Sequence, residues 1–380
     1  MSPLKRILTT HVGSLPRSEM VSDVVSAAEN GTPVNDELYD AVLTEAVDAE
    51  VKRQKRIGID IVSDGEFSKV TYASYVQHRL NGFSGNSPLV TPSDLDEFPI
   101  SAEVAMARRR QAPFLRRQCT GPVSLKTSSF VEGDVLRMAS AVKKHQPGGA
   151  FLTSASPGLI ALFHPNKYYH KYEDYLTALA EAMKVEYQAI IAGGFDLQID
   201  CPDLAMGRHT IFKNASEAAF LRQVESHVSV LNAALAGLPA ERMRIYISWG
   251  NYEGPHIHDI ALEKILPIIL RAKPAQIAIE AATPGHQHDW HVFEEIALPD
   301  DKVLLPGVID TTNNYVEHPE VVARRIERFA RAVEPERVIA STDSGFAAFA
   351  GDKMVDPKVA FCKLESLVQG AEIASKRLWS

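Results

Sequence analysis

The sequence predicts an α/β fold whose parallel sheet closes into a (β/α)8 barrel. Short apolar, β-rich runs alternate with longer helical patterns, and several of the runs end in a polar or acidic residue. Alternation on this scale implies a parallel sheet, and the number of runs implies closure into a barrel. The candidate strands cover residues 7–14, 59–66, 114–123, 150–156, 195–202, 244–249, 276–280, 303–310 and 337–343.

These nine candidate strands compete for the eight strand positions of such a barrel. The run 114–123 contains two adjacent arginines, Arg116 and Arg117, and we place it outside the barrel for this reason.

Helices are predicted between the strands. Residues 171–192 carry Tyr175, Leu179 and Met183 at helical spacing, and two glycines follow as a stop signal. Residues 320–333 and 358–369 each follow a proline, which favours the first turn of a helix.

Composition places the chain among soluble proteins and predicts one domain, residues 1–380. Stretches rich in turn residues predict insertions near residues 82–112 and 124–149.

The net charge of −8 and the short basic runs argue against nucleic-acid binding. No apolar run is long enough to span a membrane, and three separated cysteines fit a reducing compartment. We therefore expect a cytoplasmic protein with a small-molecule substrate, no nucleic-acid or membrane partner, and a possible homo-oligomeric state.

The chemistry of such a barrel lies at the C-terminal ends of its strands. Six of the side chains delivered there are carboxylates, which is more than structural roles alone require. Some carboxylates at strand ends cap helices or accept backbone hydrogen bonds, so each one also has a purely structural interpretation. The residues predicted at this mouth are His11, Asp64, Glu66, Asp200, Cys201, Tyr246, Ser248, Glu280, Asp310, Asp343 and Ser344.

Seven ordered segments carry a family resemblance. They read ILTTHVGSLPRS, VSDGEF, LQIDCPDLA, ISWGNYEGPHIHD, IEAATPGHQHDW, GVIDTTNNYVEHPE and STDSGF. Together they resemble the catalytic half of cobalamin-independent methionine synthase, and most closely its single-barrel relatives, which include coenzyme M alkyl transferases. The resemblance runs from about residue 7 to residue 370, and it implies a barrel of the methionine synthase and uroporphyrinogen decarboxylase type.

The resemblance also implies a zinc site, made in the family by His, Cys, Glu and Cys. The matching positions here are Tyr246, Ser248, Glu280 and Ser344, so the glutamate alone is retained. Hydroxyl groups keep their protons near neutral pH and are poor zinc ligands. We expect no metal at this position and no cofactor, and we interpret the histidines of GPHIHD and PGHQHD as loop or substrate contacts.

Other family positions are better preserved. Residues 12–14 resemble the turn that receives an amino-acid carboxylate, Glu66 matches the residue that contacts the substrate amine, and Asp200 matches an acidic partner. The family's catalytic histidine corresponds to Thr312, and no tryptophan lies between residues 120 and 165 where the family uses one against folate. A folate donor is therefore not expected.

Two reaction types and one non-catalytic role stay open. The leading hypothesis is metal-independent acid–base chemistry of a lyase, decarboxylase or hydrolase on a small polar or anionic molecule. The alternatives are methyl or alkyl transfer to a thiol activated by a general base, and a metabolite-binding relative without catalysis. The predicted catalytic residues are Asp200, Glu66, Glu280 and Tyr246. The predicted substrate-binding residues are His11, Ser14, Arg17, Asp64, Cys201, His209, Ser248, Trp249, Asp310 and Ser344.

Overall fold

The computed structural model describes residues 5–88, 90–109 and 115–380. Eight parallel strands form one sheet in the order β1-β10-β9-β8-β7-β6-β5-β2. Their bounds are Leu8–Thr9 (β1), Ile61–Ser63 (β2), Gly149–Ala155 (β5), Asp196–Asp200 (β6), Met243–Ile247 (β7), Gln276–Ile279 (β8), Val303–Ile309 (β9) and Ile339–Thr342 (β10).

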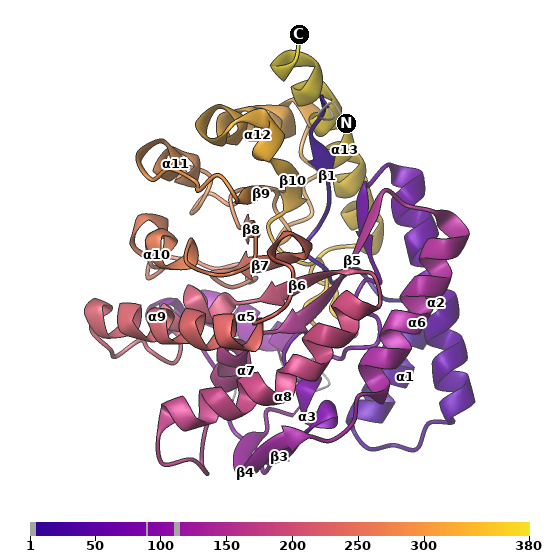
Figure 1. Ribbon diagram of the computed structural model, residues 1–380, viewed down its shortest axis with the longest axis vertical. Helices are drawn as coiled ribbons and strands as arrows, with labels where there is room; N and C mark the ends of the chain where they lie inside the picture. Colours follow the sequence, from indigo (N-terminus) through magenta and orange to yellow (C-terminus); the bar gives the residue numbers. More distant parts are fainter. Residues whose placement is uncertain (1–4, 89, 110–114) are drawn as a thin grey trace.

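The two end strands of this sheet meet and close it. The amide of Asp60 donates to the carbonyl oxygen of Thr9 at 3.1 Å, and the Thr10 hydroxyl donates to the Ile61 carbonyl at 2.9 Å. The predicted (β/α)8 barrel is therefore confirmed, with helices around the strands (Figure 1).

Helices surround the barrel, and the three predicted helices are confirmed. The helix expected over 171–192 is α8, and the two proline-led helices are α12 and α13, which begin at Pro319 and Pro357. The other helices are Glu19–Glu29 (α1), Asp36–Ile57 (α2), Val76–Arg79 (α3), Asp94–Glu97 (α4), Pro99–Arg109 (α5), Ser129–His145 (α6), Pro157–Phe163 (α7), Glu217–Ala234 (α9), Leu262–Ile269 (α10) and Val292–Glu295 (α11); α8, α12 and α13 are Tyr172–Ala192, Pro319–Val333 and Pro357–Leu378.

The ninth candidate strand lies outside the barrel, as predicted. Part of the run 114–123 falls in β4 (Gln118–Leu125), which pairs antiparallel with β3 (Leu80–Ser84) in a separate two-stranded sheet. Phe114, the first residue of that run, lies outside the described residues.

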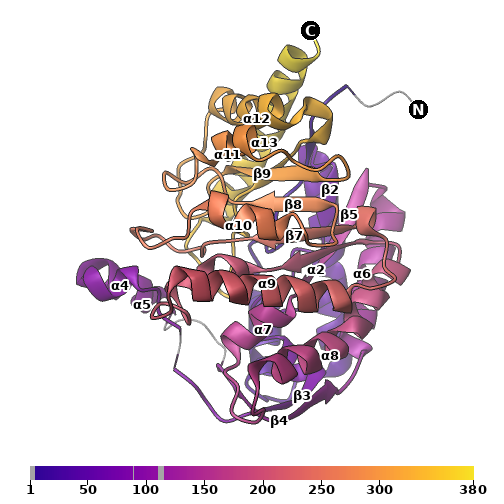
Figure 2. The same cartoon turned by 60° about the vertical axis from the view of Figure 1, so that its left-hand side comes forward.

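The chain between β3 and β4 carries two helices beyond the barrel's own. In Figure 2, α4 and α5 project from the side of the molecule at one end of α9. They fall within the predicted insertion 82–112, of which Leu89 and residues 110–112 lie outside the described part. The segment 124–149 contains α6, which packs against α2 and α8. The single-domain organisation remains a prediction.

The barrel interior is partly polar. The guanidinium of Arg244 on β7 is buried and lies 3.4 Å from the ring centroid of Phe151 on β5.

Among the described helices, none combines the length and the hydropathy that crossing a membrane requires.

Candidate active site

A cavity of about 530 Å³ opens at the C-terminal ends of the barrel strands. Its wall includes the ends of β6 and β7 and the loops that follow β1, β2, β7 and β10. Six of the residues predicted from the sequence line it: Ser14, Glu66, Asp200, Tyr246, Ser248 and Ser344.

Two acidic side chains, Glu66 and Asp200, share the cavity wall. Asp200 ends β6 and is 5 % exposed, and the Gln198 side-chain amide donates to its Oδ1 at 2.8 Å. Burial, followed by the neighbouring Glu66, raises the pKa of Asp200 to about 8. The Asp200 carboxyl is therefore mostly protonated at neutral pH and able to donate a proton to a bound molecule.

Glu66 is held from several sides in an unusual backbone conformation. Its φ is 60°, a left-handed value that side chains with a Cβ rarely adopt. Its amide donates to Asp64 Oδ1 at 3.0 Å, and Arg17 Nη2 donates to its carbonyl oxygen at 2.9 Å. Asp64 and Arg17 thus position Glu66, and neither of them lines the cavity.

The Glu66 carboxylate is the end of a short hydrogen-bonded chain. Lys69 Nζ donates to Thr153 Oγ1 at 2.6 Å, and Thr153 Oγ1 donates to Glu66 Oε1 at 2.5 Å. All three residues are buried. The Lys69 side chain is thereby linked to the Glu66 carboxyl group through the threonine hydroxyl.

Glu280 follows β8 and is surrounded by hydroxyl groups. Ser248 Oγ donates to Glu280 Oε1 at 2.6 Å, and the Tyr246 hydroxyl lies 3.2 Å from the same oxygen and 2.9 Å from the Asp343 carbonyl. Ser344 makes a side-chain hydrogen bond with Tyr246. Two of the three hydroxyls at the family's metal positions therefore contact Glu280, and the third contacts Tyr246.

The sequence is similar to known proteins of one kind. The family "Cobalamin-independent synthase, Catalytic domain" matches residues 7–150. A methionine synthase of Saccharolobus solfataricus is 25% identical over 383 aligned positions, covering 100% of this chain and 98% of the relative. A methionine synthase of Thermococcus kodakarensis is 25% identical over 373 positions, covering 97% and 94%. The chain is thus similar over nearly its whole length to proteins named methionine synthase, and residues 7–150 match the catalytic domain of the cobalamin-independent synthases.

Solved structures give the same fold. A B12-independent methionine synthase from Shewanella sp. W3-18-1, in complex with selenomethionine, superposes with a TM-score of 0.73 at 20% identity, covering 98% of this chain and 99% of that one. A putative B12-independent methionine synthase from Listeria monocytogenes gives 0.65 at 19% identity, covering 99% of both chains. Likeness at this level of identity shows the (β/α)8 fold, and the reaction of this chain is a separate question.

The residues at the family's zinc position do not fit a zinc ion. Burial raises the pKa of Tyr246 well above 10, so its phenol keeps its proton. The Ser248 hydroxyl directs its proton at Glu280. Zinc takes thiolate, imidazole and carboxylate ligands in a tetrahedron, and this chain offers there one carboxylate, Glu280, that already accepts hydrogen bonds.

The loop histidines that follow β7 and β8 bind carboxylates. His256 Nδ1 lies 2.9 Å from Asp259 Oδ2, and His286 bridges Asp259 and Asp289 at 3.0 Å each. Burial lowers the pKa of His286, but the hydrogen bonds that it donates to these two carboxylates prevail and raise the pKa to about 10. Its ring stacks on Trp249 with centroids 4.1 Å apart. These contacts order the loops beside the cavity.

Several predicted site residues lie behind the cavity wall. His11 contacts Gln54 at 2.8 Å in the barrel interior, and Cys201 is 1 % exposed with a thiol whose pKa burial raises well above its usual range. Trp249 is buried and donates through Nε1 to Ile260. Asp310 accepts from Thr312 and Asn313 within its own loop. His209 and Glu280 do not line the cavity either.

Two arginines of the basic runs, for which the sequence suggests a surface or substrate-steering role, were not among the predicted site residues. Arg108 on α5 and Arg116 line the cavity. Arg108 is held by Asp352 through contacts of 3.0 Å and 2.5 Å. Helix α5 follows a loop-like stretch that gives no pattern for its path, so no local signal placed these arginines at the mouth.

Proposed function

We propose that this methionine synthase relative catalyses metal-independent acid–base chemistry on a small polar or anionic molecule in the mouth cavity. The observation that carries the proposal is the pairing of Asp200 with Glu66 on the cavity wall. Burial keeps the Asp200 carboxyl protonated at neutral pH, whereas Glu66 accepts a hydrogen bond from Thr153, which Lys69 contacts in turn. Two neighbouring carboxyl groups in such different surroundings suit acid and base roles.

The roles follow from the contacts of each group. Asp200 donates a proton to the atom that gains electrons when a bond beside an activated carbon breaks. Glu66 either accepts a proton from the substrate or binds its amine, with Lys69 and Thr153 supporting the negative charge. Arg108 and Arg116 place positively charged side chains on the cavity wall, which suits a carboxylated substrate. Lyase and decarboxylase reactions both use this arrangement, and so does hydrolysis.

The family's metal position supports a metal-free reaction. Glu280 accepts from Ser248 and lies within reach of Tyr246, so its charge has partners without an ion. We propose that these hydroxyls replaced the ligands that activate a thiol in the family.

A second candidate is methyl or alkyl transfer to a thiol. It is favoured by the full-length similarity to proteins named methionine synthase. In this reaction a carboxylate of the cavity wall takes the proton of the thiol, whose ordinary pKa near ~8.5 requires little help. The sulfur then forms a bond to the alkyl carbon as the bond between that carbon and its donor breaks.

Substrate profiling separates the two candidates. The purified protein is incubated with a panel of small carboxylates and amines, and separately with small thiols plus methylated donors, and products are followed by mass spectrometry. Conversion of a carboxylate without a thiol supports the acid–base proposal. Formation of a thioether that depends on both thiol and donor overturns it in favour of alkyl transfer. Asp200→Asn serves as the control for background conversion.

A further inference from the structure

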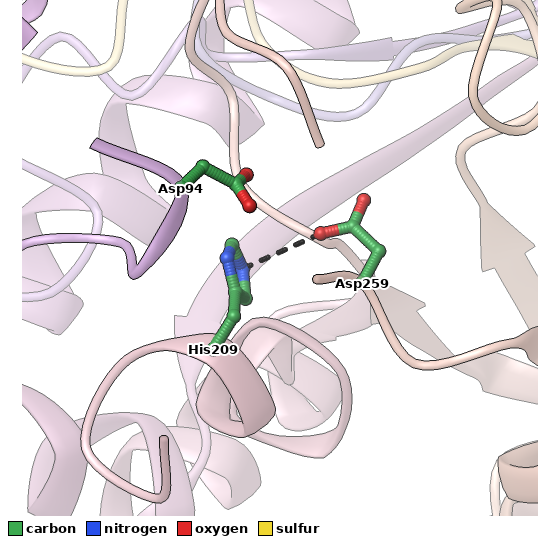
Figure 3. Close-up of side chains that lie close together, drawn as sticks. All are labelled: Asp94, His209 and Asp259. Atoms are coloured by element: carbon green, nitrogen blue, oxygen red, sulfur yellow. Dashed lines mark ion pairs between the residues drawn. The ribbon is translucent and has the colours of Figure 1, made fainter. Parts of the chain in front are cut away.

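We propose that Asp94, His209 and Asp259 form a binding site for one divalent transition-metal ion, built from residues other than those of the family's zinc position. Figure 3 shows the two carboxylates and the imidazole directed toward one another. One ligand atom from each lies within 4.8 Å of the others, which is close enough for a single ion to contact all three. Asp94 begins α4, His209 ends the short helix Met206–His209, and Asp259 lies in the loop before α10.

One ring nitrogen of His209 has a free lone pair. Its Nε2 lies 2.8 Å from the carbonyl oxygen of Trp249, and because a carbonyl only accepts, Nε2 must carry the proton. Its Nδ1 is buried and has no hydrogen-bond partner among the described residues. A neutral imidazole that donates one nitrogen to a backbone carbonyl and offers the other is the usual form of a histidine metal ligand.

Asp259 offers a second unpartnered atom. Its Oδ2 accepts from His256 at 2.9 Å and from His286 at 3.0 Å, which fixes the carboxylate. Its Oδ1 is buried without a partner among the described residues and lies 3.7 Å from His209 Nε2, beyond hydrogen-bond range. Buried polar atoms without a partner, such as His209 Nδ1 and Asp259 Oδ1, are costly unless a cation or a bound donor compensates them.

Asp94 completes the set and is also held in place. Tyr252 donates to its Oδ2 at 2.6 Å, and the amide of His258 donates to its Oδ1 at 3.1 Å. A carboxylate has about four lone-pair positions, so both oxygens keep acceptor capacity for an ion. Outer contacts of this kind, which orient each ligand, are typical of metal sites.

The donor set indicates the class of ion. Two carboxylates and one imidazole, with no thiolate, suit borderline divalent ions such as zinc, cobalt, manganese or iron(II) rather than copper(I) or calcium. Three protein ligands leave at least one position of a four-coordinate ion for water.

The consequence concerns the wall of the cavity. Asp94 is fully buried, although it belongs to the segment that projects from the barrel, and the same segment carries Arg108 to the cavity. An ion bound by Asp94, His209 and Asp259 would join this segment to the loops that follow β6 and β7. Such an ion would be bound elsewhere than at the family's zinc position, so the protein would contain a metal even though that position does not suit one.

The test uses the full chain, stripped with a chelator and titrated with Co²⁺ and Zn²⁺ by calorimetry and absorption. We expect one equivalent per chain and a cobalt spectrum without a thiolate charge-transfer band. Asp94→Asn and His209→Gln should each weaken binding by at least on the order of 10-fold, the scale known for disturbed metal shells. Glu280→Gln, at the family position, is the matched control and should bind as the unchanged protein does.

Hydrogen exchange gives a second readout that needs no substrate. Zn²⁺ should slow exchange in α4 and α5 of the unchanged protein and leave Asp94→Asn unaffected. The proposal is overturned if the stripped protein binds no equivalent, if the Asp94 and His209 variants bind as tightly as the unchanged protein, or if Glu280→Gln abolishes binding. A crystal soaked in Zn²⁺ that shows only water between the three residues also overturns it. Variants are first checked for cooperative unfolding, and the titration of the unchanged protein decides the matter if they do not fold.

Discussion

The Ser248 hydroxyl donates a 2.6 Å hydrogen bond to the Glu280 carboxylate, at positions where the family resemblance places a thiolate and a glutamate on one zinc ion. Burial raises the pKa of Glu280, whereas the bond from Ser248 lowers it. A hydrogen bond to a charged acceptor is stronger than one between neutral groups. Glu280 is thus held in place by its own protein neighbours.

Restoring the family's residues at this place should create a thiolate metal site. The triple variant Tyr246→His, Ser248→Cys, Ser344→Cys combines two thiolates and an imidazole with Glu280, which fits tetrahedral zinc. We expect the variant to bind Co²⁺ with a thiolate charge-transfer band, and to lose the native reaction because the cavity wall has changed.

The control for this variant carries Asp94→Asn in addition, so that an ion at the proposed second site does not contribute. Retention of full native activity together with a restored zinc site would show that Tyr246, Ser248 and Ser344 are bystanders. Absence of the thiolate band would show that the four side chains do not converge closely enough to hold an ion.

Asp200 and Glu66 should both be required for turnover. Asp200→Asn removes the donated proton and Glu66→Gln removes the negative charge, while each keeps the size of the side chain. We expect kcat/KM to fall by on the order of 10²-fold in each variant, the scale of a lost acid–base group. The rate is measured on the substrate found by profiling.

Arg222→Gln on the exposed face of α9 is the control and should turn over normally. If both acidic variants keep near-normal rates, the chemistry lies elsewhere in the cavity. If either variant fails to fold, its carboxyl is structural.

The barrel and much of its mouth could be predicted from the alternation of apolar runs with helical segments. This alternation makes the strands parallel, so their C-terminal ends meet on one face of the barrel. Asp200 and Tyr246 each come near the end of an apolar run, and the sheet register places them side by side on β6 and β7. The ordered alternation of runs gave the number of strands, and the arginine pair marked the run that does not belong to the barrel.

The residues that hold the site's side chains in place could not be predicted, because no local sequence pattern marks them. Thr153 lies inside β5 among ordinary strand residues, and Lys69 reaches it from the loop after β2. Asp94 and His209 are 115 positions apart in the sequence. Their approach depends on the path of the segment between β3 and β4, which no periodicity describes.

The left-handed backbone of Glu66 should appear as a difference between two small replacements. Glu66→Ala and Glu66→Gly both remove the carboxylate, so comparing them isolates the backbone. Glycine tolerates a φ of 60° and alanine does not, so we expect the glycine variant to be more stable by about 1 kcal/mol. The free energy of unfolding is measured in urea.

The same exchange at Glu45 in the middle of α2 is the control, where alanine should be the more stable replacement by about 1 kcal/mol. Equal stability of the two Glu66 variants, or a more stable alanine variant, would mean that residue 66 does not hold the left-handed conformation in solution.

The raised pKa of Asp200 should make the protein less stable as the pH rises. An unfolded aspartate titrates near 3.8, whereas folded Asp200 titrates at about 8. Its contribution to stability is therefore complete below the unfolded value and is lost as the pH rises through the folded value. Asp200→Asn cannot ionise, so its free energy of unfolding relative to the unchanged protein should increase by on the order of 4 kcal/mol between about pH 4 and about pH 8.

Urea unfolding of both proteins at several pH values measures this difference. Taking the difference cancels the titration of all other groups that are unaffected by the substitution. Asp23→Asn, exposed on α1, is the matched control and should show no comparable change with pH. A constant difference between Asp200→Asn and the unchanged protein would mean that folded Asp200 is ionised throughout this range. The acid role would then have to pass to another group, because an ionised Asp200 beside Glu66 has no proton to donate.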